Sequence, residues 1–324
     1  MNILVCGGAG YIGAHMVKML TSQGHRVTVF DNLSTGHRAA VRWGELLEGD
    51  LLDPAALATL FKGRCFEAVM HFSAKSLVAE SMADPALYYA NNVTGTLNLL
   101  AAMRAHGVEK FIFSSSAAIF GNPVQAFIDE GHPKAPINPY GATKLMVEEI
   151  LGHYQQAYGL RSVSLRYFNA AGADPAGEIG ESHQPETHLI PNVLRSLLVE
   201  GESLKVFGNK YSTSDGTCVR DYIHVEDLCR AHLLALEFLA DNAGAHGFNL
   251  GNGVGFSILE VIRAAEEVSG RKIPYALAPP RSGDPATLVA DSTLARNQLG
   301  WVPRYTDINE IIATAWAWHR NQGY

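Results

Sequence analysis

Short apolar runs alternate with helix-type patterns over the first half of the chain. Each run is free of proline and mostly apolar, which is typical of strands buried on both faces of a parallel sheet. The runs are Ile3–Cys6, Val27–Phe30, Ala68–Phe72, Phe111–Ser114 and Ser162–Arg166. In the stretches between them, Asp53-Pro54 and Asp84-Pro85 are typical helix starts. This alternation predicts a doubly wound parallel sheet.

The pattern changes after Asn169. A stretch with glycine, aspartate and proline, residues 171–186, predicts a long loop. Shorter mixed elements follow, with helices near 189–198, 225–239, 258–268 and 308–320 and a strand near 204–207. We therefore predict an α/β fold in two parts, residues 1–169 with the parallel sheet and residues 170–324 as a smaller α/β domain. The segment near 219–247 could pack back on the first part.

The composition excludes several classes of protein. Hydrophobic residues make up 47% of the 324 residues, which excludes a disordered chain. The net charge is −7 and no basic tract stands out, so nucleic acid is not an expected partner. No run approaches the roughly 20 apolar residues of a membrane helix, and no signal peptide is recognisable. With only four scattered cysteines, we expect a cytoplasmic protein without disulfides and without a membrane partner.

A glycine motif follows the first predicted strand and opens a helix. Gly7, Gly10 and Gly13 have the spacing GxxGxxG, and glycine lets the backbone turn sharply and approach a pyrophosphate. The helix N-terminus then offers free N–H groups to the phosphates. Asp31 ends the second strand, about 20 residues after the glycines, as expected for this motif. A carboxylate at this position accepts hydrogen bonds from the ribose hydroxyls of NAD and repels the 2′-phosphate of NADP. The pattern predicts a Rossmann-type domain that binds NAD; a ligand-free strand–helix turn explains less.

A second group of residues is suited to acid–base chemistry. Tyr140 and Lys144 are four residues apart and share one face of a predicted helix. A tyrosine with its ordinary pKa is a poor base at neutral pH, and a nearby ammonium is expected to lower that pKa. Ser114 and Ser116 lie where a strand ends, at the edge of a sheet that binds ligands. The spacing alone occurs by chance in many helices, and the glycine motif makes the catalytic interpretation stronger.

These motifs resemble those of the UDP-galactose (UDP-glucose) 4-epimerases, in the extended short-chain dehydrogenase/reductase family, over nearly the whole chain. The first-domain motifs specify only the extended family, whereas those near 207–225 point to 4-epimerases. The similar stretches are Gly7–Gly13, Asp31–Ser34, Gly49-Asp50, His71-Phe72, Asn91–Val93, Ser114–Ser116, Pro139–Lys144, Arg166–Asn169, Phe207–Asn209, Asp215–Thr217, Val219–Val225, and Arg281 with Gly283-Asp284.

The resemblance implies an NAD-dependent isomerase that inverts C4 of a UDP-hexose, with Tyr140, Lys144 and Ser116 as catalytic residues. It also implies a homodimer. The implied cofactor contacts are Gly7, Gly10, Tyr11, Ile12, Gly13, Asp31, Asn32, Ser34, Asp50, Leu51, Phe72, Ala74, Lys75, Asn91, Ser114, Tyr140, Lys144 and Tyr167. The implied substrate contacts are Ser116, Tyr140, Phe168, Asn169, His188, Leu189, Phe207, Arg220, Tyr222, Arg281, Asp284 and Leu288.

Four positions depart from the family pattern. Lys75 lies one position before the lysine that contacts the cofactor in some members, and Phe120 replaces a common tyrosine. His188 replaces a common asparagine. Leu288 falls where a tyrosine is associated with exclusion of N-acetylated sugars, so we expect slower turnover of UDP-GlcNAc and UDP-GalNAc.

Alternative functions remain open at this point. Epimerases of other UDP-sugars, such as UDP-pentoses or UDP-uronates, would share these motifs. A 4,6-dehydratase would carry an Asp-Glu pair where this chain has Ala117-Ala118. A non-catalytic nucleotide sensor would often lose the Tyr140 and Lys144 pair. No metal is expected, because His183 and His188 have no recognisable ligand spacing.

Overall fold

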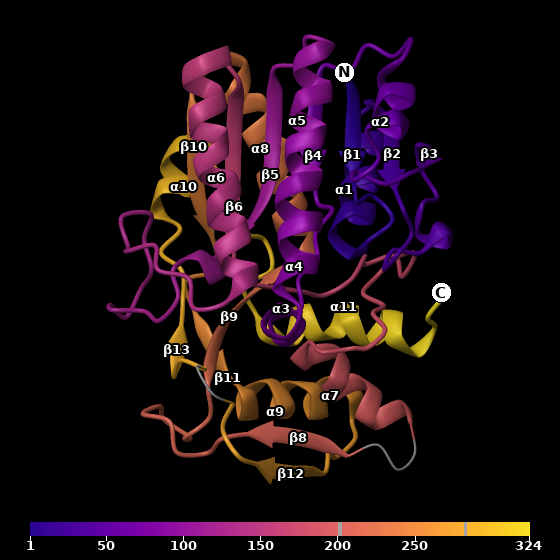
Figure 1. Ribbon diagram of the computed structural model, residues 1–324. Helices are drawn as coiled ribbons and strands as arrows, with labels where there is room; N and C mark the ends of the chain where they lie inside the picture. The colour runs from indigo at the N-terminus through magenta and orange to yellow at the C-terminus, as the bar shows by residue number, and fades with distance from the viewer. Residues whose placement is uncertain (200–202, 282–283) are drawn as a thin grey trace.

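Seven parallel strands form the central sheet of the computed structural model, which describes residues 1–199, 203–281 and 284–324 (Figure 1). The strand order is β10-β6-β5-β4-β1-β2-β3, and each neighbouring pair is parallel. The chain starts at β1 in the middle and adds strands in both directions, which is a doubly wound topology. The strands are β1 (Asn2–Cys6), β2 (Arg26–Asp31), β3 (Glu45–Glu48), β4 (Ala68–His71), β5 (Lys110–Ser116), β6 (Arg161–Tyr167) and β10 (Ala245–Leu250).

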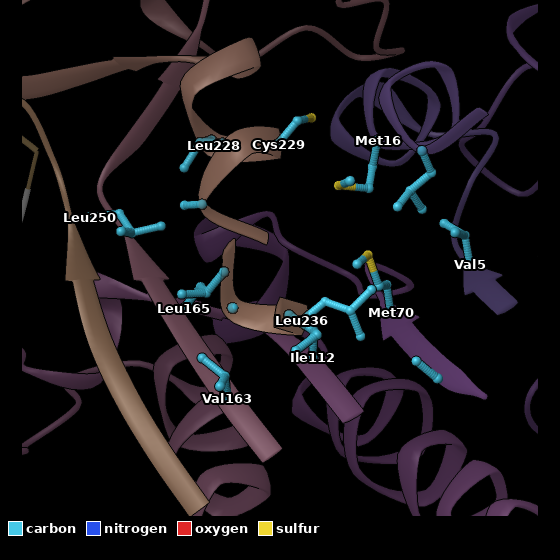
Figure 2. Close-up of a cluster of buried hydrophobic side chains, with 14 of the residues drawn as sticks. Val5, Met16, Met70, Ile112, Val163, Leu165, Leu228, Cys229, Leu236 and Leu250 are labelled. Carbon is cyan, nitrogen blue, oxygen red and sulfur yellow. The ribbon is translucent and has the colours of Figure 1, made fainter. Parts of the chain in front are cut away.

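Helices cover both faces of this sheet. Side chains alternate along β1, so Ile3 and Val5 pack on one face whereas Leu4 and Cys6 pack on the other. Figure 2 shows the first face, where side chains of α1 and α8 meet those of the strands. The helices on the first face are α1 (Tyr11–Ser22), α8 (Val225–Asp241) and α10 (Thr293–Leu299), and those on the second are α2 (Pro54–Phe61), α5 (Gly95–Ala105) and α6 (Pro139–Tyr158).

The C-terminal part has two small sheets and a hydrophobic core of its own. In one sheet β9 pairs with β7, β11 and β13, and in the other β8 pairs with β12. In Figure 1, α11 lies between the central sheet and the layer formed by α7 and α9. The strands are β7 (Asn169–Ala171), β8 (Leu204–Phe207), β9 (Val219–His224), β11 (Gly255–Ser257), β12 (Tyr275–Ala278) and β13 (Thr287–Leu288), and the helices are α7 (Leu189–Leu198), α9 (Ile258–Ser269) and α11 (Ile308–Arg320).

The chain returns from the C-terminal part to the central sheet. β10 pairs with β6 at the sheet edge, and α8 lies beside α1. Short helices α3 (Val78–Ala83) and α4 (Pro85–Tyr88) precede a π-helical segment, Tyr89–Thr94, that leads into α5. Because β10 comes from beyond residue 169, the division of the chain at 169 and 170 remains a prediction.

The predicted α/β fold with a doubly wound parallel sheet is confirmed. Asp53 and Asp84 cap α2 and α4, as their position before proline predicts. The strands β3 and β10 were missing from the prediction, because both lie at sheet edges and have polar or glycine-containing sequences. Within the described ranges, no helix is long and apolar enough to cross a membrane.

A buried ion pair ties α6 to the central sheet. Glu148 of α6 accepts hydrogen bonds from the Arg166 guanidinium, at 2.7 Å from Nη2 and 2.9 Å from Nε, and from the Ser115 hydroxyl at 2.6 Å. Only 7% of each charged side chain is exposed. Glu148→Gln therefore leaves the Arg166 charge without its counterion, and we expect a loss of about 2–3 kcal/mol in the free energy of unfolding. Chemical denaturation of the two proteins measures this loss.

Glu149→Gln is the matched control for this substitution. Glu149 is the next residue of α6 and is exposed, so its replacement should change the free energy of unfolding by less than about 0.5 kcal/mol. Equal effects of the two substitutions would contradict the assignment of the Glu148 pair as a stabilising contact.

Candidate active site

The glycine motif forms a tight turn between β1 and α1. Gly7 has a φ of +79°, a conformation that side-chain-bearing residues rarely adopt, and a Cβ there would lie 2.5 Å from the Ser73 nitrogen. A Cβ on Gly13 would overlap the Gly7 carbonyl oxygen and lie 2.8 Å from its carbon. Gly10 is the N-cap of α1 and offers no side-chain cap. The turn is thus closed to side chains and leaves the first amides of α1 facing the cleft.

Asp31, at the end of β2, is held by two backbone amides. Its Oδ2 accepts from the Ala9 N–H at 3.0 Å, and its Oδ1 accepts from the Leu33 N–H at 2.8 Å. Burial raises the pKa of this carboxyl, and the two N–H donors oppose the rise. Beyond it, the Asn32 amide donates to Asp50 Oδ2 at 2.8 Å. The Asp31 carboxylate is therefore fixed beside the glycine turn.

A cleft of about 580 Å³, partly open to solvent, joins these features. Besides the turn, it is lined by predicted residues of four other segments. The predicted cofactor residues that line the cleft are Gly7, Gly10, Asp31, Asn32, Ser34, Asp50, Leu51, Phe72, Ala74, Lys75 and Asn91. The prediction omitted Phe30, Thr35, Gly36, Gly49 and Ser73, which also line it and are sequence neighbours of predicted residues.

This cleft fits NAD. A glycine turn without side chains suits a pyrophosphate, and a fixed carboxylate near it suits the two ribose hydroxyls. Tyr11 and Ile12 point their side chains elsewhere: the Tyr11 hydroxyl donates to the Gly172 carbonyl at 2.6 Å, and Ile12 packs in the core. The backbone of Lys75 is positioned by Asn92, which accepts from the Lys75 N–H at 2.8 Å and donates to its carbonyl at 3.0 Å.

The Asp31 carboxylate should decide the choice of cofactor. In Asp31→Asn the charge that repels a 2′-phosphate is lost, and one strong acceptor becomes an amide. We expect NAD affinity to fall about 10- to 100-fold, equivalent to the 1.5–3 kcal/mol of hydrogen bonds to a charged group. We also expect the ratio of NAD affinity to NADP affinity to decrease. Calorimetry with both cofactors on the stripped protein measures this. Asp53→Asn, at the N-cap of α2 outside the cleft, is the control and should bind NAD normally.

The catalytic candidates converge where β5 ends. Asn138 caps α6 through the Gly141 N–H at 2.8 Å, so Tyr140 and Lys144 occupy successive turns of one face. The Lys144 ammonium donates to the Ser114 carbonyl at 2.8 Å and lies 5.8 Å from the centre of the Tyr140 ring. The Ser116 hydroxyl lies close enough to the Tyr140 phenol to oppose the rise of its pKa. The predicted triad of residues is thus brought together by β5 and α6.

Burial decides the protonation of this pair. It raises the pKa of Tyr140, against a smaller opposite effect of the Ser116 hydrogen bond. It lowers the pKa of Lys144 to about 7, and Glu148 opposes that change. The expected lowering of the Tyr140 pKa by Lys144 is not found in this structure, because burial of the phenol raises that pKa. A phenolate here requires further positive charge in the cleft.

Aromatic and hydroxyl groups form the wall beyond Lys144. The hydroxyls of Ser114 and Tyr167 contact each other. The His232 ring lies 4.8 Å from the Phe72 ring and 6.1 Å from the Tyr167 ring, between centroids. His232 was not predicted, and its position in the middle of α8 gave no signal in the sequence.

Six of the predicted substrate residues lie in the small sheets or in α7: Asn169, Leu189, Phe207, Arg220, Tyr222 and Leu288. The Arg220 guanidinium donates to the Pro285 carbonyl at 2.9 Å and lies 3.4 Å from Asp284 Oδ1. The Arg281 guanidinium lies 4.2 Å from the centre of the Phe207 ring. An arginine over an aromatic ring suits a nucleoside diphosphate, because the ring can stack on a base and the guanidinium can bind phosphate oxygens. Gly283, which was part of the family pattern, lies outside the described residues.

Five other predicted substrate residues lie in the C-terminal part or next to it. Asn169 donates to the Asp221 carbonyl at 3.0 Å, and Leu189 is the first residue of α7. Phe168 and Leu288 pack against the same small apolar cluster, with Leu288 opposite Arg220 in the pairing of β13 and β9. Tyr222 is only 5% exposed and packs in the C-terminal core, so its side chain is a packing residue in this structure.

A cluster of two histidines and two glutamates precedes α7. His188 Nδ1 contacts Glu181 Oε1, and His183 Nδ1 lies 3.2 Å from the same oxygen and 3.8 Å from Glu186 Oε2. The Glu181 carboxylate raises the pKa of His188, and burial of Glu181 is outweighed by the two imidazoles, which lower its pKa to about 2. Sequence spacing did not indicate this grouping. His224 lies apart from it and stacks on Tyr305, with ring centroids 3.9 Å apart.

Comparison with known proteins gives a consistent result. Residues 3–251 match the NAD dependent epimerase/dehydratase family. A UDP-glucose 4-epimerase of Halalkalibacterium halodurans is 51% identical over 320 residues, which cover 99% of this chain and 96% of that relative. One of Rhizobium leguminosarum bv. trifolii is 51% identical, covering 98% and 97%. The crystal structure of UDP-glucose 4-epimerase from Brucella ovis in complex with NAD has 50% identity and a TM-score of 0.93, covering 97% of each chain.

Proposed function

The chain belongs to the NAD-dependent epimerase/dehydratase family, and from this premise we propose that it is a UDP-glucose 4-epimerase. It interconverts UDP-galactose and UDP-glucose through a 4-keto sugar, with tightly bound NAD. The observation that carries the proposal is the placement of Tyr140, Ser116 and Lys144 at the end of β5, beside the cleft that fits NAD. Relatives of this name match the chain over almost its whole length.

The protein's own residues bind, orient and move a proton. Tyr140, with Ser116 beside it, takes the proton of the sugar 4-hydroxyl and later returns it. Lys144 is held near the Tyr140 ring by the Ser114 carbonyl and adds positive charge there in its protonated form. NAD, when bound, supplies the hydride acceptor and a further positive charge. Because inversion at C4 requires the sugar to turn, most of the binding energy belongs on the nucleotide, through Arg220 and Arg281.

The rival functions are less well supported. A 4,6-dehydratase needs acid–base groups at the positions where this chain has Ala117 and Ala118, two alanines that begin a short 3₁₀-helix after β5. A nucleotide sensor would not need the buried Lys144 contact. Epimerisation of another UDP-sugar, a UDP-pentose or a UDP-uronate, uses the same machinery and remains the main alternative.

The test is to incubate the purified protein with UDP-galactose without added NAD and to assay UDP-glucose. We expect product, and we expect NAD to be released when the protein is denatured. Activity on UDP-pentoses, UDP-uronates or N-acetylated sugars alone would replace the hexose assignment. No turnover of any of them, with NAD added, would favour the nucleotide sensor.

Leu288 is proposed to set the range of sugars. It packs beside Phe168 in a small apolar cluster at the sugar end of the site. We expect the protein to turn over UDP-GalNAc more slowly than UDP-galactose. A larger side chain in Leu288→Tyr should reduce UDP-GalNAc turnover by at least about tenfold, since a steric conflict of 1–3 kcal/mol has that effect, and UDP-galactose turnover much less.

The kinetics of both substrates measure this change, with Leu277→Tyr as the control. Leu277 lies on β12, 58% exposed, so its replacement should leave the ratio of the two activities unchanged. Equal losses for both sugars in Leu288→Tyr, or no UDP-GalNAc turnover by the unaltered protein at high concentration, would contradict the role of Leu288.

We also propose that the protein is a homodimer that packs through α6 and the helical segment with Asn91, and that it works in the cytoplasm. The exposed apolar side chains of Met146 and Tyr158 on α6 and of Tyr89 beside Asn91 support the first proposal. The four free cysteines support the second. Size-exclusion chromatography with light scattering tests the dimer, since a monomer at micromolar concentration would contradict it.

A further inference from the structure

Four metal-ligating side chains from one short segment face each other before α7. They are Glu181, His183, Glu186 and His188, and one ligand atom from each lies within 4.8 Å of all the others. None of the steps of C4 inversion uses Glu181, His183 or Glu186. The grouping therefore needs a role of its own.

We propose that this cluster is a structural site for a divalent transition-metal ion, with Zn²⁺ as the best fit. Two imidazole nitrogens and two carboxylate oxygens are a donor set that zinc accepts. A tetrahedral zinc with bonds of about 2.0–2.2 Å needs donor atoms roughly 3.3–3.6 Å apart. The His183 nitrogen lies 3.2 Å from the Glu181 oxygen and 3.8 Å from the Glu186 oxygen, which is close to this spacing. His188 Nδ1 contacts the Glu181 oxygen more closely and would move away from it as the ion enters. Four protein donors fill such a shell, which is typical of structural sites.

Charge and burial favour a cation at this point. The side chains of Glu181 and Glu186 are 4% and 2% exposed, and two neighbouring buried carboxylates are costly without positive charge between them. In the described part of the chain, the ion pairs of these carboxylates are made with His183 and His188. A divalent ion between the two carboxylates would supply that positive charge.

The rival interpretation is a cluster of ion pairs that holds no metal. The surrounding hydrogen bonds favour a metal site, because they orient the donors. Glu186 Oε1 accepts from the N–H groups of Thr187 and His188 at 2.8 and 2.9 Å, so Oε2 is the oxygen turned toward His183. The Glu181 carbonyl accepts from the Trp318 indole of α11 at 2.9 Å. Ligands held in place by outer hydrogen bonds are typical of metal sites.

An ion here would fasten the segment between the two parts of the protein. The Ser182 carbonyl hydrogen-bonds with His37 of the cofactor part at 2.9 Å, and the Tyr11 ring lies 6.5 Å from the His183 ring. The segment leads directly into α7, whose first residue is Leu189. The expected effect of the ion is therefore on stability and on substrate KM, with little effect on kcat.

The experiment uses the full chain with its NAD, dialysed against a chelator and titrated with ZnCl₂. Bound zinc is measured by mass spectrometry after desalting. We expect one equivalent per chain, a higher Tm with zinc, and visible absorption typical of tetrahedral coordination when Co²⁺ replaces zinc. Since outer-sphere changes alone cost metal sites 10- to 100-fold in affinity, His183→Ala should bind zinc at least about 100-fold more weakly. His153→Ala, an exposed histidine of α6, is the matched control and should bind normally.

Either of two results would overturn the proposal: no stoichiometric zinc in the unaltered protein, or zinc binding by His183→Ala as tight as in the control. If His183→Ala has lost its NAD and its fold, Glu186→Gln decides the question in the same assay, because it keeps the size and the backbone hydrogen bonds of the side chain. Zinc is measured directly, so the outcome does not depend on whether the protein is a 4-epimerase.

Discussion

Replacing Tyr140 by phenylalanine should lower kcat for UDP-galactose by about 10³-fold, within the 10²- to 10⁴-fold contribution of general acid–base groups. The substitution removes the only atom of the side chain that can move a proton and keeps the ring in place. The NAD content should stay at the level of the unaltered protein, because the cleft around the glycine turn is formed by other segments. Steady-state kinetics and NAD release on denaturation measure the two quantities.

Tyr154→Phe is the matched control for Tyr140→Phe. Tyr154 lies 14 residues beyond Tyr140 on the same helix, and its ring packs against Tyr158 at a centroid distance of 5.2 Å, near the start of β5 and away from its end. Its replacement should leave kcat nearly unchanged. A Tyr140→Phe protein that retained a tenth or more of the activity, with NAD bound, would mean that another group carries the proton, and Ser116 would then be the residue to examine.

Replacing Gly13 by alanine should abolish the retention of NAD. The added Cβ would overlap the Gly7 carbonyl oxygen and lie 2.8 Å from the Gly8 Cα. Backbone atoms cannot rotate away as a side chain can, so the turn must open or the start of α1 must shift. We expect an overpacking cost of about 1–3 kcal/mol in stability, together with purification of a protein without NAD. Absorbance of the released cofactor and thermal unfolding measure both effects.

Gly152→Ala provides the comparison within a helix. Gly152 lies in α6, and a Cβ there meets no atom within 4 Å. Alanine at this position should raise stability slightly, by about 0.5–1 kcal/mol, because it restricts the unfolded chain and favours the helix. If Gly13→Ala kept its NAD and were as stable as Gly152→Ala, the tight turn would not be the phosphate-binding element.

Much of the fold could be predicted because its signals are local. The buried strands are apolar along their length, and Asp53 and Asp84 mark helix starts by their position before proline. The edge strands β3 and β10 lack such a signal, since an edge strand is not buried on both faces. β10 belongs to the central sheet because it pairs with β6, and the paired residues are more than eighty positions apart in the sequence.

The cofactor side of the site could also be predicted from the sequence. The glycine turn, Asp31 and the pairing of Tyr140 with Lys144 each depend on spacing within one strand, turn or helix. Resemblance supplied the more distant residues, such as Phe72 and Asn91, which the structure places in the cleft. Neighbours such as Thr35 and Gly36 were missed, because a lining position depends on the path of the loop after β2.

The sequence by itself determined the α/β class, the glycine turn and the residues that we propose for the acid–base chemistry. Only the tertiary structure decided the direction in which the pKa values of Tyr140 and Lys144 shift, because the shifts depend on the surrounding burial. It also placed Tyr222 in a core and brought Glu181 and His188 into contact. Spacing along a helix or strand is set by backbone geometry, whereas hydration, burial and the meeting of irregular segments are set by all the elements packed around them.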